Sequence, residues 1–185
     1  MAILTTDRLR LRPWTPADAD FAFDLYSRWE VQRYIGRSPR VMADRAEAEA
    51  AIAKWCEPRG PVHGVWALER SDDCRLIGTM LLKSIPASGP QEPLSASGDT
   101  EIGWHLHPDA WGLGYATEAG RCVLEHAFTA GLLEVVAVTH PANIASQAVA
   151  LRIGMSARGL TDRYYNATCA LFGATNPFSR FPTAA

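Results

Sequence analysis

The chain has 185 residues, of which 48% are hydrophobic and 21% charged, and its formal net charge is −2. This size and composition are typical of one globular domain, which we expect to span residues 1–185. The near-neutral charge argues against a nucleic-acid partner, and the lack of an 18-residue apolar run argues against a membrane span. The four cysteines form no Cys-x-x-Cys pair, so we expect no metal site, no disulfide framework and a cytoplasmic location.

The first quarter of the chain combines strand and helix patterns. Leu9 and Leu11 alternate with arginines, as in a half-buried strand. Thr15 followed by Pro16 is typical of a helix start, because proline fits the first helical position. The elements expected here are a strand at residues 6–13, a helix at 15–28, an irregular connection at 30–40 and a helix at 44–55.

Two apolar segments, at residues 62–69 and 76–85, are predicted to be neighbouring strands. A polar turn joins them, so they are expected to form an antiparallel hairpin. Residues 86–98 are rich in proline, glycine and serine and predict a mobile loop. We expect this loop to interrupt the sheet rather than to separate two domains.

The central stretch predicts a strand at residues 100–107, a tight turn and a long helix. Ile102, Trp104 and Leu106 alternate with polar residues or glycine, which is the period of a strand, and Pro108 ends the strand. Gly112 and Gly114 then permit a tight turn, and the helix that follows ends at Gly131. A glycine turn that leads into a helix presents free N–H groups to an anion such as a pyrophosphate.

The last part of the chain adds a second strand–helix unit. A strand at residues 134–139 completes a β-α-β crossover with the preceding strand, so these two strands are expected to be parallel. A helix at residues 144–153 follows, with Asn143 and Ser146 at its start. The remaining elements expected are strands at 155–158 and 168–172 and a frayed tail from about residue 176.

These patterns together resemble the GNAT (GCN5-related N-acetyltransferase) superfamily, in particular the branch of ribosomal-protein N-terminal acetyltransferases. The resemblance covers nearly the whole chain. It is carried by the motifs TDRLRLRPW, EIGWHLHP, WGLGYATEA and Asn143-x-x-Ser146 leading into Gly154-Met155. It implies one α/β domain with a mixed, mostly antiparallel, twisted sheet, one splayed parallel strand pair and helices on both faces.

The resemblance also implies acetyl-CoA as co-substrate, without a metal. The family's loop motif, Gln/Arg-x-x-Gly-x-Gly/Ala, has Trp111 at its first position here, a mild departure from the pattern. Backbone N–H groups of the loop are expected to hold the pyrophosphate, and the backbone near Leu106 to pair with pantetheine. Asn143 is expected to hydrogen-bond the cofactor arm, with a helix cap as the alternative. The expected cofactor residues are Leu106, Trp111, Gly112, Leu113, Gly114, Tyr115, Ala116, Thr117, Asn143 and Ser146.

Few side chains are candidates for the chemistry. Many family members carry a Tyr acid seven residues after the Asn, but this chain has Ala150 there. The branch resembled can place a Ser three residues after the Asn, so Ser146 is the expected donor to the leaving sulfur. Glu101 is the first candidate for the base, acting through water, and His105 is the second.

The acceptor amine is less well defined by the sequence. Its pocket is expected to involve the first helix, residues 30–40, the 86–98 loop and residues 164–165. Trp29, Tyr34 and Tyr165 are the candidate wall residues, and core packing is the alternative for each. An α-amine with a pKa near ~8 needs a weaker base than a lysine near ~10.4, which favours a protein or peptide N-terminus.

Three alternatives remain open at this stage. The acceptor could instead be a small amine, such as an amino acid or an antibiotic. The protein could be a non-catalytic acyl-CoA-binding module, or a nucleotide-binding domain in which Glu134 contacts a ribose. A homodimer is also possible from the short C-terminal strands.

Overall fold

Eight strands form one sheet in the computed structural model, which describes residues 1–177. Neighbouring strands are antiparallel except for β5 and β6, which are parallel. The mixed, mostly antiparallel sheet with one parallel pair is therefore confirmed. Across the sheet, the order is β1 (Leu4–Thr5), β2 (Leu9–Pro13), β3 (Gly64–Arg70), β4 (Leu76–Pro86), β5 (Ala96–Leu106), β6 (Glu134–Thr139), β8 (Cys169–Thr175) and β7 (Ser156–Thr161).

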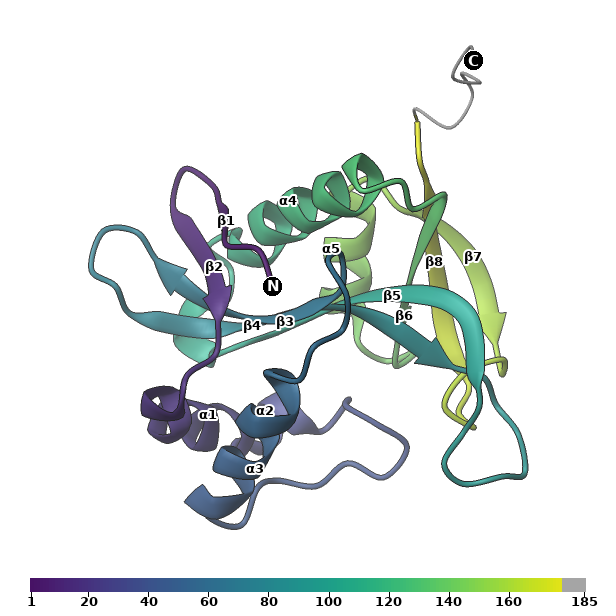
Figure 1. Ribbon diagram of the computed structural model, residues 1–185. Helices are drawn as coiled ribbons and strands as arrows, with labels where there is room; N and C mark the ends of the chain where they lie inside the picture. The colour runs from purple at the N-terminus through teal and green to yellow at the C-terminus, as the bar shows by residue number, and fades with distance from the viewer. Residues whose placement is uncertain (178–185) are drawn as a thin grey trace.

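Helices cover both faces of this sheet, as Figure 1 shows. One face carries α4 and α5, and the other carries α1 to α3 beside β2, β3 and β4. None of the described helices is long and apolar enough to cross a bilayer. The bounds are α1 (Ala19–Tyr26), α2 (Trp29–Gln32), α3 (Arg45–Trp55), α4 (Tyr115–Thr129) and α5 (Ile144–Arg152).

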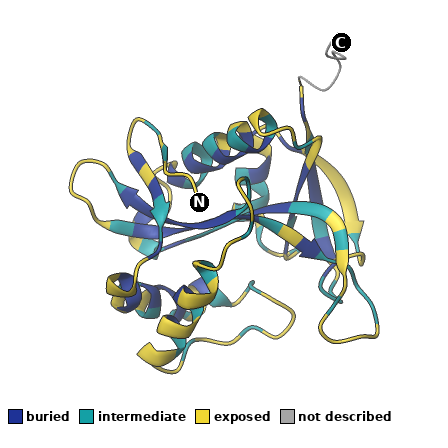
Figure 2. Ribbon diagram, viewed as in Figure 1, coloured by how far each residue is buried: buried dark blue, intermediate teal, exposed yellow. Residues whose placement is uncertain are grey.

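The core lies on both sides of β3, whose residues 64–69 are all buried (Figure 2). Trp66 and Leu68 pack into the cluster under α4, whereas Val65 and Ala67 pack into the cluster under α1 and α3. Successive strand residues point to opposite faces, so one strand supplies both cores. This explains why the segment is an almost continuous apolar run rather than an alternating one.

The helices α4 and α5 pack closely on their shared face. A side chain at Gly120 would come within 3.0 Å of Ile153, so glycine is what allows this approach. The apolar stripe of α4, which includes Ala119, Val123 and Ala127, is fully buried. Both helix N-termini are thereby held near the same end of the sheet, beside β5 and β6.

The parallel pair β5–β6 separates soon after it forms. The only residue pair in register between these strands is Glu101 with Val136. Beyond it, β5 continues to Leu106 alongside β4, while β6 continues to Thr139 alongside β8. The splayed parallel pair implied by the family resemblance is thus present.

Several predicted boundaries were wrong in the N-terminal half. The strand expected at residues 6–13 begins only at Leu9, because Thr6 forms a turn in which its hydroxyl accepts from the Leu9 N–H at 3.0 Å. The turn creates an extra two-residue strand, β1, before it. The connection expected to be irregular at 30–40 begins inside the short helix α2.

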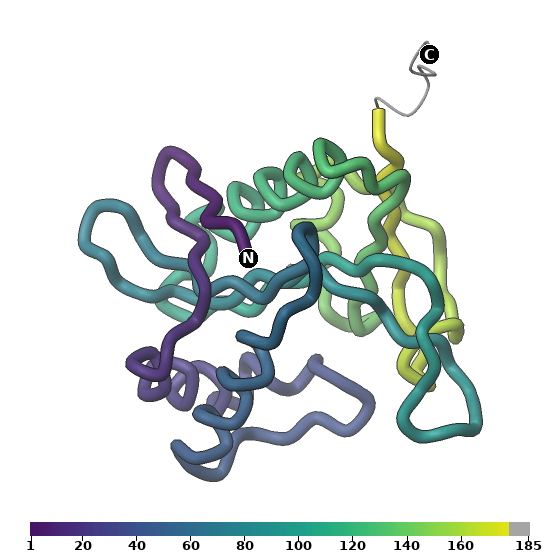
Figure 3. Tube along the Cα trace, in the orientation of Figure 1, coloured from purple at the N-terminus to yellow at the C-terminus, as the bar shows by residue number. Residues whose placement is uncertain are grey.

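The loop expected at residues 86–98 is shorter and better anchored than predicted. Strand β4 extends to Pro86 and β5 begins at Ala96, with the Ser97 hydroxyl donating to the Ile85 carbonyl at 2.6 Å. The remaining loop lies against the β7–β8 loop, which Figure 3 shows at one end of the molecule. Local composition could not reveal this support, because the partner loop is more than 60 residues away in the chain.

The C-terminal strands also run further than predicted, β7 to Thr161 and β8 to Thr175. The expected frayed tail does not begin at Asn176, which is buried and donates to the carbonyls of Phe128 and Leu132 at the end of α4. The part of the expected tail from residue 178 lies outside the described residues.

Candidate active site

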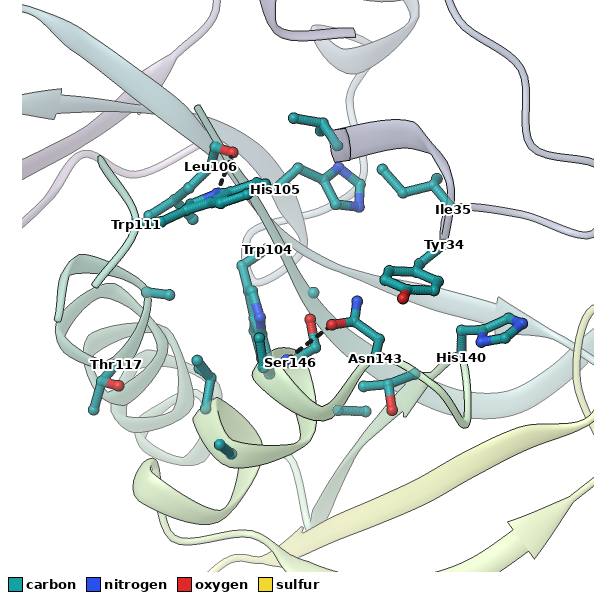
Figure 4. A pocket seen from close by; sticks show the side chains of 18 of the residues that line it. Tyr34, Ile35, Trp104, His105, Leu106, Trp111, Thr117, His140, Asn143 and Ser146 are labelled. Carbon is teal, nitrogen blue, oxygen red and sulfur yellow. Dashed lines mark hydrogen bonds between the residues drawn. The ribbon is translucent and has the colours of Figure 1, made fainter. Parts of the chain in front are cut away.

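A cleft of about 750 Å³ opens where β5 and β6 separate. Its walls come from β5, β6, the N-terminal turns of α4 and α5, and residues 30–35 after α1. Figure 4 shows the α4 and α5 side chains on one side and those of Tyr34 and Ile35 on the other. The cleft therefore connects the two helix N-termini with the face of the sheet that carries α1 to α3.

The edge of β5 that borders the cleft carries backbone groups that β6 does not pair. The His107 N–H donates to the Ile77 carbonyl of β4 at 2.9 Å. Because the backbone groups of successive residues alternate between the two edges of a strand, the N–H and C=O groups of residues 102, 104 and 106 point away from β4. Pairing with β6 ends at Glu101, which leaves this edge open. The Leu106 carbonyl is already engaged, since the Trp111 indole N–H donates to it at 2.8 Å (Figure 4). An extended ligand could add to the rest of this edge as a further strand.

The N-terminus of α4 is built to meet an anion. Gly112 and Gly114 have φ values of 74° and 83°, the left-handed region that glycine adopts at little cost. The helical ladder begins with Glu118 N–H donating to Gly114 O, and among the described residues no side chain caps this end. The N–H groups of residues 115–117 thus remain available beside the cleft.

A cluster around Arg8 supports this turn from outside. Arg8 donates to the Leu113 carbonyl at 3.1 Å, and its guanidinium lies 4.6 Å from the ring centre of Tyr115. Glu118 accepts from Arg8 and from the Thr6 hydroxyl, so the one carboxylate in the first turn of α4 is directed away from the free N–H groups. The sequence did not reveal this contact between the N-terminal turn and the glycine turn.

The N-terminus of α5 faces the cleft from the next strand. Asn143 is its N-cap, with Oδ1 accepting from the Ser146 N–H at 3.1 Å. Its amide nitrogen has no hydrogen-bond partner within residues 1–177, so it is available to donate to a ligand. The Ser146 hydroxyl has no hydrogen-bond partner among the described residues, and Figure 4 shows it directed into the cleft. Ala150, at the position where many family members carry a Tyr, is fully buried in the core.

Glu101 is a buried carboxyl at the inner end of the cleft, with an exposed fraction of 8%. Its Oε2 accepts from the Tyr165 hydroxyl and lies 3.9 Å from the Lys83 ammonium. Burial raises the pKa of Glu101, while Lys83 and Tyr165 act in the opposite direction. Glu101 is therefore a stronger proton acceptor than an exposed glutamate.

His105 lies on the same face of β5 as Glu101. It is two residues before His107, which directly follows the strand. Its Nδ1 is 3.0 Å from the Tyr26 hydroxyl, which donates to the Thr79 hydroxyl at 2.8 Å. Burial, together with the positive charge of Lys83, lowers the pKa of His105 to about 4. The imidazole is accordingly neutral at pH 7 and holds a proton weakly.

Aromatic rings close the cleft on the side of residues 30–35. The Tyr34 ring centre lies 5.1 Å from that of His140, and the Arg33 guanidinium lies 4.7 Å from the Tyr34 ring centre. Figure 4 shows Tyr34 and His140 next to each other, on the same side of Asn143. These rings join the segment after α2 to the end of β6 across the cleft mouth.

The structure brings most of the candidate residues together but excludes three from the cleft lining. Trp29 is 56% exposed and does not line the cleft. Leu113 contributes only to the turn, and Tyr165 sits behind Glu101 rather than beside it in the wall. The candidates that line the cleft are Tyr34, Glu101, His105, Leu106, Trp111, Gly112, Gly114, Tyr115, Ala116, Thr117, Asn143 and Ser146.

The expected walls of the acceptor pocket need a correction too. The cleft is not lined by α1, by the 86–98 loop or by residues 164–165. These segments either border a separate hollow or pack in the core. Sequence reasoning missed Trp104 and His140, which line the cleft, and within the expected 30–40 segment it did not single out Ile35, which lines the cleft too. Of these, His140 had a usable signal, because it directly follows a parallel strand at its carboxyl end.

Comparison with known proteins places these features in context. A family model described as an acetyltransferase (GNAT) domain matches residues 8–156. The chain is 32% identical to the uncharacterized N-acetyltransferase YoaA of Bacillus subtilis, over 88% of this chain and 87% of that protein. It is 30% identical to the FsC-acetyl coenzyme A-N(2)-transacetylase of Aspergillus fumigatus, over 83% of this chain and 64% of that protein.

The fold is similar to that of solved structures as well. One is RimL, a ribosomal L7/L12 alpha-N-protein acetyltransferase solved with coenzyme A, which matches with a TM-score of 0.74. The match covers 94% of this chain and 98% of RimL, at 16% sequence identity. At this identity, the similarity concerns the fold.

Proposed function

The chain belongs to the GNAT acetyltransferase family and is an acetyltransferase, and from this premise we propose that it transfers the acetyl group of acetyl-CoA to the α-amine of a protein or peptide. The observation that carries the proposal is the open edge of β5, which runs between two helix N-termini. A cofactor with an extended amide arm and a pyrophosphate matches both features.

In this proposal the N–H groups of residues 115–117 bind the pyrophosphate at the start of α4. The pantetheine amides pair with the free backbone groups of β5, and the Asn143 amide nitrogen donates to the same arm. The thioester then lies near Ser146, with Glu101 and His105 reached from the other face of β5. The cofactor and the amine would enter the cleft from opposite sides of the strand.

The chemistry requires one bond to form and one to break. The neutral amine attacks the thioester carbon, the C–N bond forms, and the C–S bond breaks as the thiolate leaves. Glu101 accepts the proton that the amine loses, through water or directly, and the Ser146 hydroxyl donates a hydrogen bond to the leaving sulfur. Ala150 is buried in the core and its methyl group has no proton to donate, so it cannot perform the second task.

Two considerations favour an α-amine as the acceptor. An α-amine has a pKa near ~8, so roughly a tenth of it is already neutral at pH 7, and a single buried carboxylate suffices as base. RimL, which shares the fold, is named as an alpha-N-protein acetyltransferase. The second candidate acceptor is a small molecule that carries such an amine.

We further propose that the protein acts in the cytoplasm. All four cysteines, which lie in the described part of the chain, are unpaired. Unpaired thiols are typical of a reducing compartment, which is also where acetyl-CoA would be available.

Calorimetric titration with acetyl-CoA, and with NAD as control, tests the cofactor assignment. We expect acetyl-CoA to bind with a micromolar dissociation constant and NAD not to bind measurably. Thiol release with α-amine peptides, with free amino acids and with a peptide whose only amine is an internal lysine then tests the acceptor. Equal turnover of the lysine peptide and the α-amines at pH 7 would contradict the α-amine proposal. Binding without thiol release from any amine would identify an acyl-CoA-binding module instead.

Ser146→Ala is expected to lower kcat about tenfold, less than the roughly 100-fold or more that general acid catalysis contributes, because a thiolate is a good leaving group. The dissociation constant for acetyl-CoA should stay within twofold, since the variant removes only a hydroxyl beside the sulfur. Ser156→Ala, an exposed serine at the start of β7, is the matched control and should leave both values unchanged. An unchanged kcat in Ser146→Ala would remove Ser146 from the mechanism.

A further inference from the structure

Two consecutive tyrosines in the β7–β8 loop each bind a carboxylate of β5. The Tyr164 hydroxyl donates to Asp99 Oδ2 at 2.7 Å, and the Tyr165 hydroxyl donates to Glu101 Oε2 at 2.5 Å. Asp99 and Glu101 are two residues apart on a strand, so both project from the same face of β5. The loop therefore places one phenol hydroxyl on each of two neighbouring carboxylates, of which only Glu101 lines the cleft.

The backbone of this loop is strained and held in place. Tyr165 and Asn166 have φ values of 58° and 51°, a conformation that non-glycine residues adopt at a cost and that persists where the surroundings enforce it. Asn166 supplies that enforcement, since its side-chain amide accepts from the Gly89 N–H at 2.8 Å and donates to the Gly89 carbonyl at 2.9 Å. The Ser88 hydroxyl accepts from the Asn166 N–H at 3.0 Å as well.

The position of the β7–β8 loop determines which carboxylate oxygen of Glu101 is available for the reaction. Tyr165 does not line the cleft, whereas Glu101 does. One oxygen of Glu101, Oε2, is engaged from behind by Tyr165 and by Lys83, whose ammonium also lies 5.5 Å from the Tyr165 ring centre. The other oxygen, Oε1, has no hydrogen-bond partner among residues 1–177.

We propose that Tyr165 is a positioning residue for the reaction: its hydroxyl holds Glu101 so that Oε1 serves the acceptor amine, and it favours the charged carboxylate. The inference rests on the proposed role of Glu101 as base. A phenol suits this task because burial and the adjacent Glu101 charge raise the pKa of Tyr165, which keeps its proton on the donor. Burial raises the pKa of Glu101, and the Tyr165 hydrogen bond lowers it. Without this hydrogen bond, the pKa of Glu101 should rise.

The other ionisable groups around Glu101 stay the same in the test. They are Lys83 on β4, Asp99 and His105 on β5, and Cys169 on β8. A variant that changes only the Tyr165 hydroxyl thus isolates its effect on the carboxylate.

Tyr165→Phe tests the proposal, with Tyr164→Phe as the matched control. We expect the acid limb of the kcat/KM profile to move to higher pH in Tyr165→Phe, with a rate at pH 6 about tenfold below that of the wild type, because a hydrogen bond to a charged group is lost. The dissociation constant for acetyl-CoA should not change. Tyr164→Phe removes a bond to Asp99 only and should leave the acid limb where it is.

Carbon NMR of labelled glutamate gives a readout that does not depend on activity. The Glu101 signal, identified by its loss in Glu101→Gln, should titrate at higher pH in Tyr165→Phe than in the wild type. An unchanged Glu101 titration, or an equal shift in Tyr164→Phe, would overturn the inference. A wild-type protein that acetylates no amine would overturn the proposed function instead, and the NMR titration would still decide the role of Tyr165.

Discussion

Replacing Thr117 with Asp is expected to weaken acetyl-CoA binding about a hundredfold or more. Thr117 lies in the first turn of α4 and lines the cleft beside the free N–H groups. A carboxylate there would repel a pyrophosphate about 4 Å away by roughly 4 kcal/mol at an effective dielectric constant near 20. Since about 1.4 kcal/mol corresponds to tenfold in affinity, even partial screening leaves a large loss.

The same change should not unfold the protein. An acidic residue near a helix N-terminus is favourable for the helix itself, so thermal stability should be equal to or above that of the wild type. Thr117→Asn is the matched control, with similar size and no charge, and it should lose no more than a few-fold in affinity. Calorimetric titration of both variants measures the difference. Equal affinities for the Asp and Asn variants would show that the pyrophosphate does not bind at the start of α4.

Replacing Glu101 with Gln is expected to lower kcat/KM about a hundredfold. Glutamine keeps the size of the side chain and can still accept from the Tyr165 hydroxyl, so the geometry of the cleft is retained. What is lost is the proton acceptor, and general-base catalysis contributes roughly 100-fold to 10,000-fold. The dissociation constant for acetyl-CoA should stay within twofold, which separates the chemical step from binding.

The pH profile identifies the base independently. Only the carboxylate form of Glu101 accepts a proton, so the wild-type rate should rise with pH through the pKa of Glu101, which burial raises above the ordinary glutamate range. In Glu101→Gln this acid limb should disappear. If His105 were the base, the limb would lie near pH 4, where its pKa is held by burial, and it would disappear in His105→Gln instead.

The turns at the starts of α4 and α5 could be predicted from the sequence. Gly112 and Gly114 mark the turn because their left-handed φ values are a local requirement that glycine meets. Asn143 marks the start of α5 because its side chain caps the same turn in which it lies. Such features depend on contacts within a few residues, which a local pattern can encode.

The acceptor side depends on contacts between distant segments, and here the predictions were incomplete. Tyr165 was expected in the pocket wall, but its hydroxyl reaches Glu101, 64 residues earlier in the chain. Trp29 was expected there too, but its side chain is exposed on the surface, whereas Tyr34, which was also expected there, lines the cleft. A strand pattern shows which residues share a face of the sheet, but it does not show which residues of a distant loop will contact them.

By itself, the sequence determined most of the strand and helix order, without β1 and α2, and the glycine turn at the start of α4, because hydrophobic period and backbone freedom are local properties. The mixed sheet followed from the resemblance to the GNAT family. The tertiary structure alone decided how the ends of the chain support the site. Arg8 from the N-terminal turn holds the Leu113 carbonyl, and Tyr165 from the last loop holds Glu101. It also set the pKa directions of Glu101 and His105, because burial and the distance to Lys83 exist only once the strands and loops have packed.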